Sequence, residues 1–195
     1  MSKDIERKIA VIFVTDVVAF SKMMEKNEDE TLRSFRSCRD ILDNLFKEHG
    51  GRIFNTAGDS VLAEFQSAVS AVICAKEFQK LVRERNANVS EDAAMDFRIG
   101  LNMGDVIVEG ENLYGEGVNV AARLEALSQP GGVCLSKSIL DFVNKKTELV
   151  FNNLGEQKVK NTTVHAYDLA DPELEKRSLE SADTEKTEDA SKPPA

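Results

Sequence analysis

The sequence lacks any apolar run that approaches the roughly 20 residues a helix needs to cross a bilayer. Residues 1–8 are polar and charged, without the apolar stretch of a signal peptide. Only three cysteines are present, odd in number, far apart and without CxxC spacing. We expect buried free thiols and a reducing compartment, because a disulfide framework needs paired cysteines. The sequence therefore predicts a soluble, cytoplasmic protein with no direct membrane insertion, and it leaves attachment through a partner open.

Basic residues are also in deficit. The chain has 25 Lys and Arg against 34 Asp and Glu, and its net charge of −9 argues against a nucleic-acid partner. Residues 171–195 contain eight acids and four bases, so they hold −4 of the −9. Their polar, proline-ended composition predicts a disordered acidic tail or linker. The remaining residues, 1–170, are enough for a single folded domain with a sizeable core.

A protein nucleophile with an activating base is missing as well. The chain has two histidines, His49 and His165, and neither has sequence neighbours at the spacing of a metal site or a catalytic triad. The sequence therefore offers no convincing protein nucleophile.

The chain instead offers a regular alternation of strand and helix patterns. The order β-α-β-β-α-β, followed by further elements, predicts an α+β ferredoxin-like sandwich with extra C-terminal strands and a helix. The expected elements are a strand at Ile9–Val14, a helix at Glu28–Glu48, a strand pair at Arg52–Thr56 and Ser60–Phe65, a helix capped by Ser67, a hairpin of Met95–Asn102 and Val106–Glu109, a helix at Glu116–Leu127, a strand at Val133–Leu135, a helix from Ser136 to Asn144, and strands at Leu149–Leu154 and Val164–Leu169.

Several separate motifs in this order resemble the class III adenylate/guanylate cyclase catalytic domain, in its bacterial single-domain form. The resemblance covers about Lys8 to Leu169. The motifs are Thr15-Asp16-Val17-Val18-Ala19-Phe20-Ser21, Gly50-Gly51-Arg52, Thr56-Ala57-Gly58-Asp59-Ser60, Phe97-Arg98-Ile99-Gly100-Leu101, Gly117-Val118-Asn119-Val120-Ala121-Ala122-Arg123-Leu124-Glu125, Gln129-Pro130-Gly131-Gly132, and Leu154-Gly155 with Lys158-Val159-Lys160.

The resemblance implies a metal site at Asp16 and Asp59. In the family these carboxylates hold two Mg²⁺ or Mn²⁺ ions about 4 Å apart, and the ribose 3′-hydroxyl of the substrate is the nucleophile. Without the resemblance, an Asp that ends a strand or follows Gly in a turn is more simply a turn former.

The resemblance also implies how a nucleoside triphosphate would bind. Backbone N–H groups at the start of a helix would cradle the phosphates, and Arg98 and Lys160 would meet them, although a solvated charge is a competing interpretation of both. Asn119 would bind the ribose and Arg123 the α-phosphoryl group; a surface arginine beside an inward asparagine is the alternative. The residues of the backbone cradle are Val17, Val18, Ala19 and Phe20, with Ala19 where the family usually has glycine.

The base-reading positions depart from the family. Its adenylate cyclases carry Lys and Asp where this chain has Asn55 and Asn112. An amide can pair with adenine but can also flip to pair with another base. The sequence thus supports cyclase chemistry, with ATP favoured, better than it supports one base.

The family places its metal residues and its Asn/Arg helix in different halves of the fold. The resemblance therefore implies a head-to-tail homodimer with sites at the interface. A regulatory domain or protein outside this chain fits the same picture. Two alternatives stay open: a degenerate nucleotide-binding or regulatory module, and a structural domain that dimerises a larger assembly.

Overall fold

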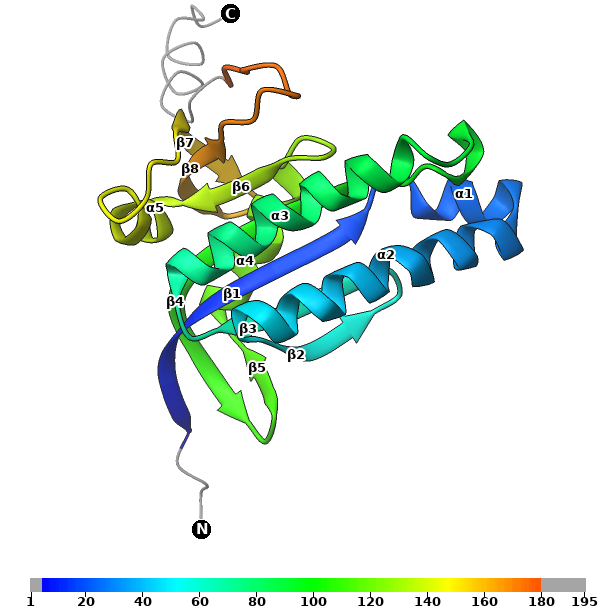
Figure 1. Cartoon of the computed structure of the whole chain (residues 1–195). Coiled ribbons are helices and arrows are strands. Elements are labelled where there is room, and N and C mark those ends of the chain that lie inside the picture. The colour runs from blue at the N-terminus through cyan, green and yellow to red at the C-terminus, as the bar shows by residue number, and fades with distance from the viewer. Residues whose placement is uncertain (1–4, 180–195) are drawn as a thin grey trace, which may run out of the picture.

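The computed structural model of the protein describes residues 5–179, which form one mixed sheet with helices on both faces (Figure 1). The sheet order is β2-β3-β1-β4-β6-β8-β7, and β5 pairs with β4. The strands are β1 (Glu6–Val17), β2 (Gly51–Ala57), β3 (Ser60–Phe65), β4 (Phe97–Glu109), β5 (Asn112–Tyr114), β6 (Val133–Ser136), β7 (Phe151–Val159) and β8 (Thr162–Leu169). The helices are α1 (Phe20–Lys26), α2 (Glu28–His49), α3 (Ala68–Asn86), α4 (Glu116–Leu127) and α5 (Lys137–Val143), with a 3₁₀ turn at Glu91–Ala93.

The predicted ferredoxin-like core is confirmed. β1, α2, β2, β3, α3 and β4 follow one another in the chain, and their strands lie in the order β2-β3-β1-β4, all antiparallel. Long apolar faces drive this arrangement, since α2 and α3 pack together over one face of the sheet. Phe13 of β1 meets Phe46 of α2 edge to face, at 5.2 Å between ring centroids. Ser67 caps α3 as expected, its side chain accepting from the Ser70 N–H.

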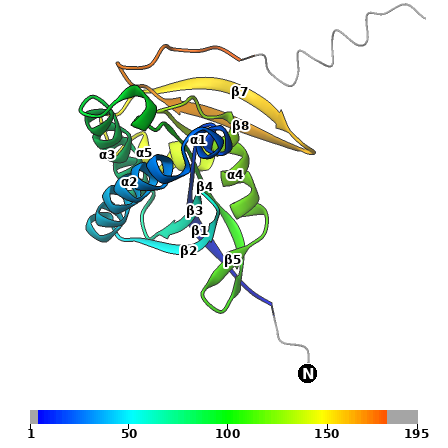
Figure 2. The same ribbon diagram turned by 90° about the vertical axis from the view of Figure 1, so that its right-hand side faces the viewer.

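The opposite face of the sheet is covered by α4 (Figure 2). The side chains of β1 alternate between these faces: Val11 and Phe13 join the core under α2 and α3, whereas Ile12 and Val14 join a second cluster with α4. Asp16 continues the second set. The carboxylate at the end of β1 therefore emerges on the same side as α4.

The hairpin expected around Met103-Gly104-Asp105 is wrong. β4 runs without a turn from Phe97 to Glu109, because β1 is long enough to pair with all of it. Gly104 is extended opposite Ala10, and an added Cβ would lie 3.4 Å from the Gly117 Cα of α4. This glycine therefore serves close helix packing and not a turn. The hairpin falls later, between β4 and β5, where Gly110 has a φ of 61°.

The C-terminal strands extend the sheet beyond β4. β6 lies parallel to β4, and β8 and β7 follow antiparallel. The domain's contacts continue past the boundary expected at residue 170: Asp171 pairs with Arg83 at 2.7 Å, and Arg177 pairs with Asp168 at 2.7 Å. Residues 180–195 of the expected acidic tail lie outside the described residues. No helix within residues 5–179 is long and apolar enough to cross a membrane.

Candidate active site

Asp16 and Asp59 are brought to the same end of β1. Asp59 follows Gly58 in the turn between β2 and β3, and its Oδ2 accepts a hydrogen bond from the Val17 N–H at 2.9 Å. This bond ties the turn to the residue next to Asp16. Both aspartates are half-buried. One carboxylate at the end of a strand and one in the adjoining turn form a group that can attract a hard cation.

Arg98 lies at the same place. In the β1–β4 ladder it stands directly opposite Asp16, so both side chains project from one face of the sheet. Its Nε donates to the Ser128 carbonyl at 3.0 Å. The guanidinium is thereby anchored to the end of α4 beside the carboxylates.

Glu125 is a third carboxyl group at this site. It comes from α4, is 7% exposed and hydrogen-bonds Asp16. Burial, the bond to Asp16 and the negative charges of Asp16 and Asp59 raise the pKa of Glu125 to about 9, while Arg98 opposes the shift. A carboxyl that keeps its proton at neutral pH can donate to an ionised neighbour.

The segment that was expected to bind phosphate differs from the sequence prediction in where its helix begins. The helix after β1 begins at Phe20 and not at Val17, because Val17 still belongs to β1 and Ala19 adopts a left-handed conformation with φ 55°. The Val17 N–H bonds Asp59, and the Val18 N–H bonds the Asp96 carbonyl at 2.8 Å. The positive φ of Ala19 gives the physical reason why glycine suits this position.

A cavity of about 400 Å³ opens beside Val18 and Ala19, between α1, α2 and the Glu91–Ala93 turn. Its lining holds the Lys26 ammonium, which pairs with Asp92 at 2.5 Å, and four carboxylates. The carboxylates belong to Glu30, Glu91, Asp92 and Asp96. Because negative charge outnumbers positive charge here, the cavity disfavours a triphosphate.

Asn119 and Arg123 project from another side of α4. Asn119 is exposed and Arg123 is half-buried, one turn further along the helix. The Nη1 of Arg123 donates a hydrogen bond to the Thr162 hydroxyl at the start of β8. Lys160 lies two residues before Thr162, in the β7–β8 turn, with a φ of 55°. Arg123 and Lys160 therefore belong to one basic region that is formed by α4 and this turn.

Asn55 and Asn112 lie on strands that contact each other, β2 and β5. Arg52 of β2 joins them, since its Nη1 donates to the Glu111 carbonyl at 2.8 Å. Asn112 Nδ2 donates to the Tyr114 hydroxyl at 2.9 Å, while its Oδ1 accepts from the Leu113 N–H. The two amides thus lie on neighbouring strands, and Asn112 lies near the start of β2, away from the turn that carries Asp59.

Residues 2–171 match the family model described as "Adenylate and Guanylate cyclase catalytic domain". The chain belongs to this family. The cyclase domain is 42% identical over 163 residues to a Rhizobium meliloti (strain 1021) protein named "Putative adenylate cyclase 3", covering 83% of this chain and 28% of the relative. It is 26% identical over 138 residues to an adenylate cyclase of Streptomyces coelicolor, covering 70% and 34%. The cyclase domain spans less than half the length of these curated relatives.

Solved structures show the same fold. The adenylate/guanylate cyclase/hydrolase of Silicibacter pomeroyi superposes with a TM-score of 0.79 at 34% identity, covering 86% of this chain and 99% of that one. The adenylyl cyclase CyaB of P. aeruginosa gives 0.74 at 21% identity, covering 91% and 100%. The predicted class III cyclase fold is therefore confirmed, and the protein is a cyclase catalytic domain with adenylate cyclase homologues.

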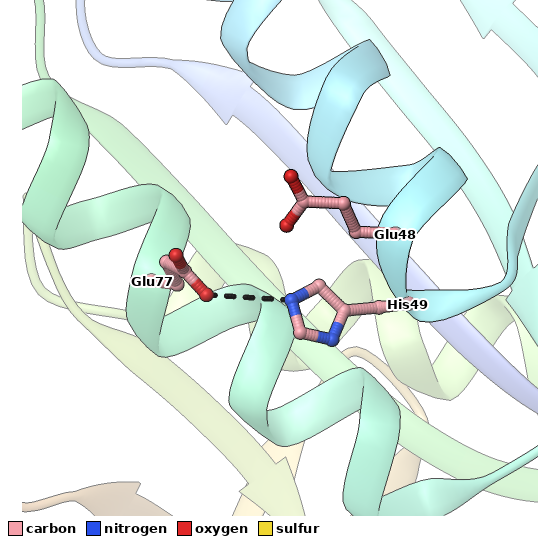
Figure 3. A group of neighbouring side chains, drawn as sticks. All are labelled: Glu48, His49 and Glu77. Carbon is pink, nitrogen blue, oxygen red and sulfur yellow. Dashed lines mark hydrogen bonds and ion pairs between the residues drawn. The ribbon is translucent and has the colours of Figure 1, made fainter.

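His49, which has no sequence neighbours at the spacing of a metal site, does have spatial neighbours of metal-ligand type. Figure 3 shows His49 at the end of α2, with the carboxylates of Glu48 and Glu77 near its imidazole ring. Its Nε2 lies 3.3 Å from Glu77 Oε2 of α3, and the ligand atoms of all three residues lie within 4.8 Å of one another. Glu48 is exposed and the other two are partly so, which suits a polar bridge between α2 and α3. His165 instead stacks on Tyr167 and bonds Asn153.

Two residues of the candidate site were not singled out by sequence reasoning. Glu125 ends the motif that contains Asn119 and Arg123, and its spacing of four from Ala121 and eight from Gly117 places it on the buried face of α4. A charged residue at a buried position was the available signal. Thr162 gave no signal, because its contact with Arg123 joins elements 39 residues apart.

Proposed function

We propose that this cyclase domain converts a nucleoside triphosphate, with ATP favoured, to the 3′,5′-cyclic monophosphate and pyrophosphate. The observation that carries the proposal is the gathering of Asp16 and Asp59 at one end of β1 by the Asp59–Val17 bond. Asn119 and Arg123 on α4 would supply the groups that act on the ribose and on the reacting phosphoryl group.

Asp16 and Asp59 would hold two Mg²⁺ or Mn²⁺ ions. Their carboxylate oxygens are the ligands that these hard cations prefer. Oδ2 of Asp59 is engaged by the Val17 N–H, which leaves Oδ1 outside that bond. When bound, the ions favour ionisation of the ribose 3′-hydroxyl and offset the charge of the triphosphate.

The basic region around α4 would stabilise the reacting phosphoryl group. The 3′-oxygen bonds to the α-phosphorus while the bond to the pyrophosphate oxygen breaks, so negative charge grows on the oxygens around phosphorus. A guanidinium fixed in advance, as Arg123 is by Thr162, stabilises that charge at little reorganisation cost. Asn119 would orient the ribose, and Lys160 would bind the leaving pyrophosphate.

The backbone cradle would hold the remaining phosphates. The N–H groups of Ala19 and Phe20 lie at the start of α1, directly after the carboxylate of Asp16. Those of Val17 and Val18 have protein partners, so their use for phosphate requires an exchange of these bonds. Arg98 would balance charge on the carboxylate side.

We further propose a head-to-tail homodimer with two composite sites. Within one chain, Glu125 of α4 faces Asp16, whereas Arg123 turns toward Thr162 of β8. The metal side and the arginine side of one chain therefore face different directions, and a second copy would supply the missing half of each site. Large exposed apolar side chains, Ile9 at 66% and Tyr114 at 46% exposure, lie on β1 and β5 and suit a subunit contact.

Asn55 and Asn112 would line the base pocket. Both are neutral amides, so no wrong base leaves a buried charge without a partner, and discrimination is expected to be modest. The same two residues are the one feature that favours the alternative of a degenerate nucleotide-binding or regulatory module.

The decisive test is to incubate the purified protein with Mn²⁺ and ATP, GTP, CTP or UTP, and to measure the cyclic nucleotides by mass spectrometry. We expect 3′,5′-cyclic AMP as the main product and less cyclic GMP. The matched control is Asp16→Ala, which should retain the fold by circular dichroism but less than about a tenth of the activity, since two-metal chemistry needs both carboxylates. Formation of none of the four products by the folded wild type would support the degenerate module instead.

A further inference from the structure

We propose that Glu48, His49 and Glu77 form a zinc site that joins α2 to α3. The site goes beyond the proposed function, because it uses no residue that is assigned to cyclase chemistry. It also lies elsewhere in the fold. His49 precedes the start of β2 and Asp59 follows its end, and β2 is seven residues, roughly 20 Å, long.

The packing of α2 on α3 brings the three side chains together (Figure 3). His49 Nε2 lies 3.3 Å from Glu77 Oε2, and the ligand atoms of all three residues lie within 4.8 Å of one another. A tetrahedral zinc ion with bonds of about 2.0–2.1 Å holds its ligand atoms about 3.4 Å apart. His49 and Glu77 already have this spacing. Glu48 is exposed, so a rotamer change of its side chain can close the remaining gap.

The donor set selects the kind of metal. It combines one imidazole nitrogen with two carboxylate oxygens, a mixture that suits Zn²⁺, whereas Mg²⁺ prefers oxygen ligands alone. A water molecule would complete the four ligands of the ion. The pair of Asp16 and Asp59 offers only oxygen. The two places should therefore select different metals.

The charge around His49 favours a cation independently of the ligand geometry. Within residues 5–179, Glu77 has His49 as its ion-pair partner, and no Lys or Arg forms an ion pair with Glu48 or Glu77. His49 is also the last residue of α2, where the helix dipole is negative. A dication at this position would offset two carboxylates for which the protein supplies only an imidazole.

A bound ion would stabilise the contact between α2 and α3. Its ligands come from two helices that meet only in the folded chain, so the ion binds the folded state in preference to the unfolded one. Zinc should therefore raise the stability of the domain through these three residues.

The first experiment is a calorimetric titration of the untagged full chain with ZnCl₂ in excess Mg²⁺, which occupies any oxygen-only site. We expect one Zn²⁺ per chain. Loss of a group that only orients a zinc ligand commonly costs about 10–100-fold in affinity, so His49→Ala and Glu77→Gln should each raise the dissociation constant at least about tenfold. The matched control is His165→Ala, since His165 stacks on Tyr167 and bonds Asn153. This variant and Asp16→Ala should bind zinc as the wild type does.

The second experiment compares urea unfolding in zinc and in EDTA. Zinc should raise the midpoint of the wild type and of His165→Ala, and leave that of His49→Ala unmoved. If His49→Ala does not fold, Glu48→Gln at its exposed position replaces it in both experiments.

The proposal is overturned if the wild type binds no zinc, or if His49→Ala binds it as tightly as the wild type. Loss of binding in Asp16→Ala overturns it too, because the ion would then lie in the cyclase site. Cyclic nucleotide formation is not measured in either experiment, so a failure of the proposed function would leave this result standing.

Discussion

Arg123 donates a hydrogen bond from Nη1 to the hydroxyl of Thr162, joining α4 to the first residue of β8. A guanidinium on a long side chain is otherwise free to sample many rotamers. This contact fixes it beside the turn that carries Lys160. Thr162 thus holds the guanidinium of Arg123 in place, although it lies outside the motifs named above.

Replacing Thr162 by Val should lower kcat about tenfold with little change in KM. The reason is that the bond orients Arg123 for the transition state, and one such bond is worth about 1–1.5 kcal/mol. Thr162→Ser should restore most of the loss, and steady-state kinetics with Mn²⁺–ATP measure it. The matched control is Thr163→Val, an exposed threonine on the same strand. Equal kinetics for the Thr162 and Thr163 variants would show that the contact has no catalytic role.

The pKa of Glu125 predicts how stability depends on pH. Below its ordinary value of 4.5 the carboxyl is protonated in the folded and the unfolded chain alike. Between there and about 9, the unfolded chain ionises it and the folded chain does not, so the free energy of unfolding falls as pH rises.

Glu125→Gln should remove this slope and be more stable than wild type at pH 8 in EDTA, by at least about 1 kcal/mol, the equivalent of one pKa unit. Urea unfolding at pH 5 and pH 8 measures the effect. Parallel losses in both proteins between these pH values would assign the slope to other groups.

Ala19 stands in the left-handed region with φ 55° and ψ 37°. An L-residue there costs about 1–2 kcal/mol relative to a right-handed conformation, and glycine avoids most of this cost. Ala19→Gly should therefore raise the free energy of unfolding by about 1 kcal/mol in urea. A decrease would mean that the segment between β1 and α1 adopts another backbone conformation.

The base-reading positions predict a change of specificity. Asn55→Lys combined with Asn112→Asp should raise the preference for ATP over GTP about tenfold or more. A Lys donor and an Asp acceptor match adenine N1 and its amino group, whereas guanine presents the opposite pattern, and a mispaired buried contact costs about 1–3 kcal/mol. The ratio of kcat/KM for the two nucleotides measures it. An unmoved ratio in the double variant would remove both residues from the base pocket.

Local patterns were sufficient to predict most elements of the fold. The helix at Glu28–His49 and the strand at Ser60–Phe65 follow from apolar spacing and from the glycines and turns that bound them. The hairpin at Gly104 was wrong because a glycine can serve either a turn or a close approach, and only the pairing of β1 with all of β4 decides between them. Local sequence does not contain that information.

In the candidate site, too, some features could be predicted from local sequence and others could not. Asp16, Asp59, Asn119 and Arg123 stand in motifs, so their places could be predicted from the sequence. The contacts of Glu125 with Asp16 and of Arg123 with Thr162 could not, because each depends on how distant elements pack. The roles of all these residues stay predictions until they are measured.

In the proposed homodimer, one chain holds both halves of a cyclase site but assembles them only with a second copy. The most direct measurement mixes Asp16→Ala with Arg123→Ala, each inactive alone, after subunit exchange has been demonstrated. Because half of the dimers would be mixed and would hold one undamaged site, activity should return to about a quarter of wild type. No recovery from exchanged subunits would contradict the claim and place each site within a single chain.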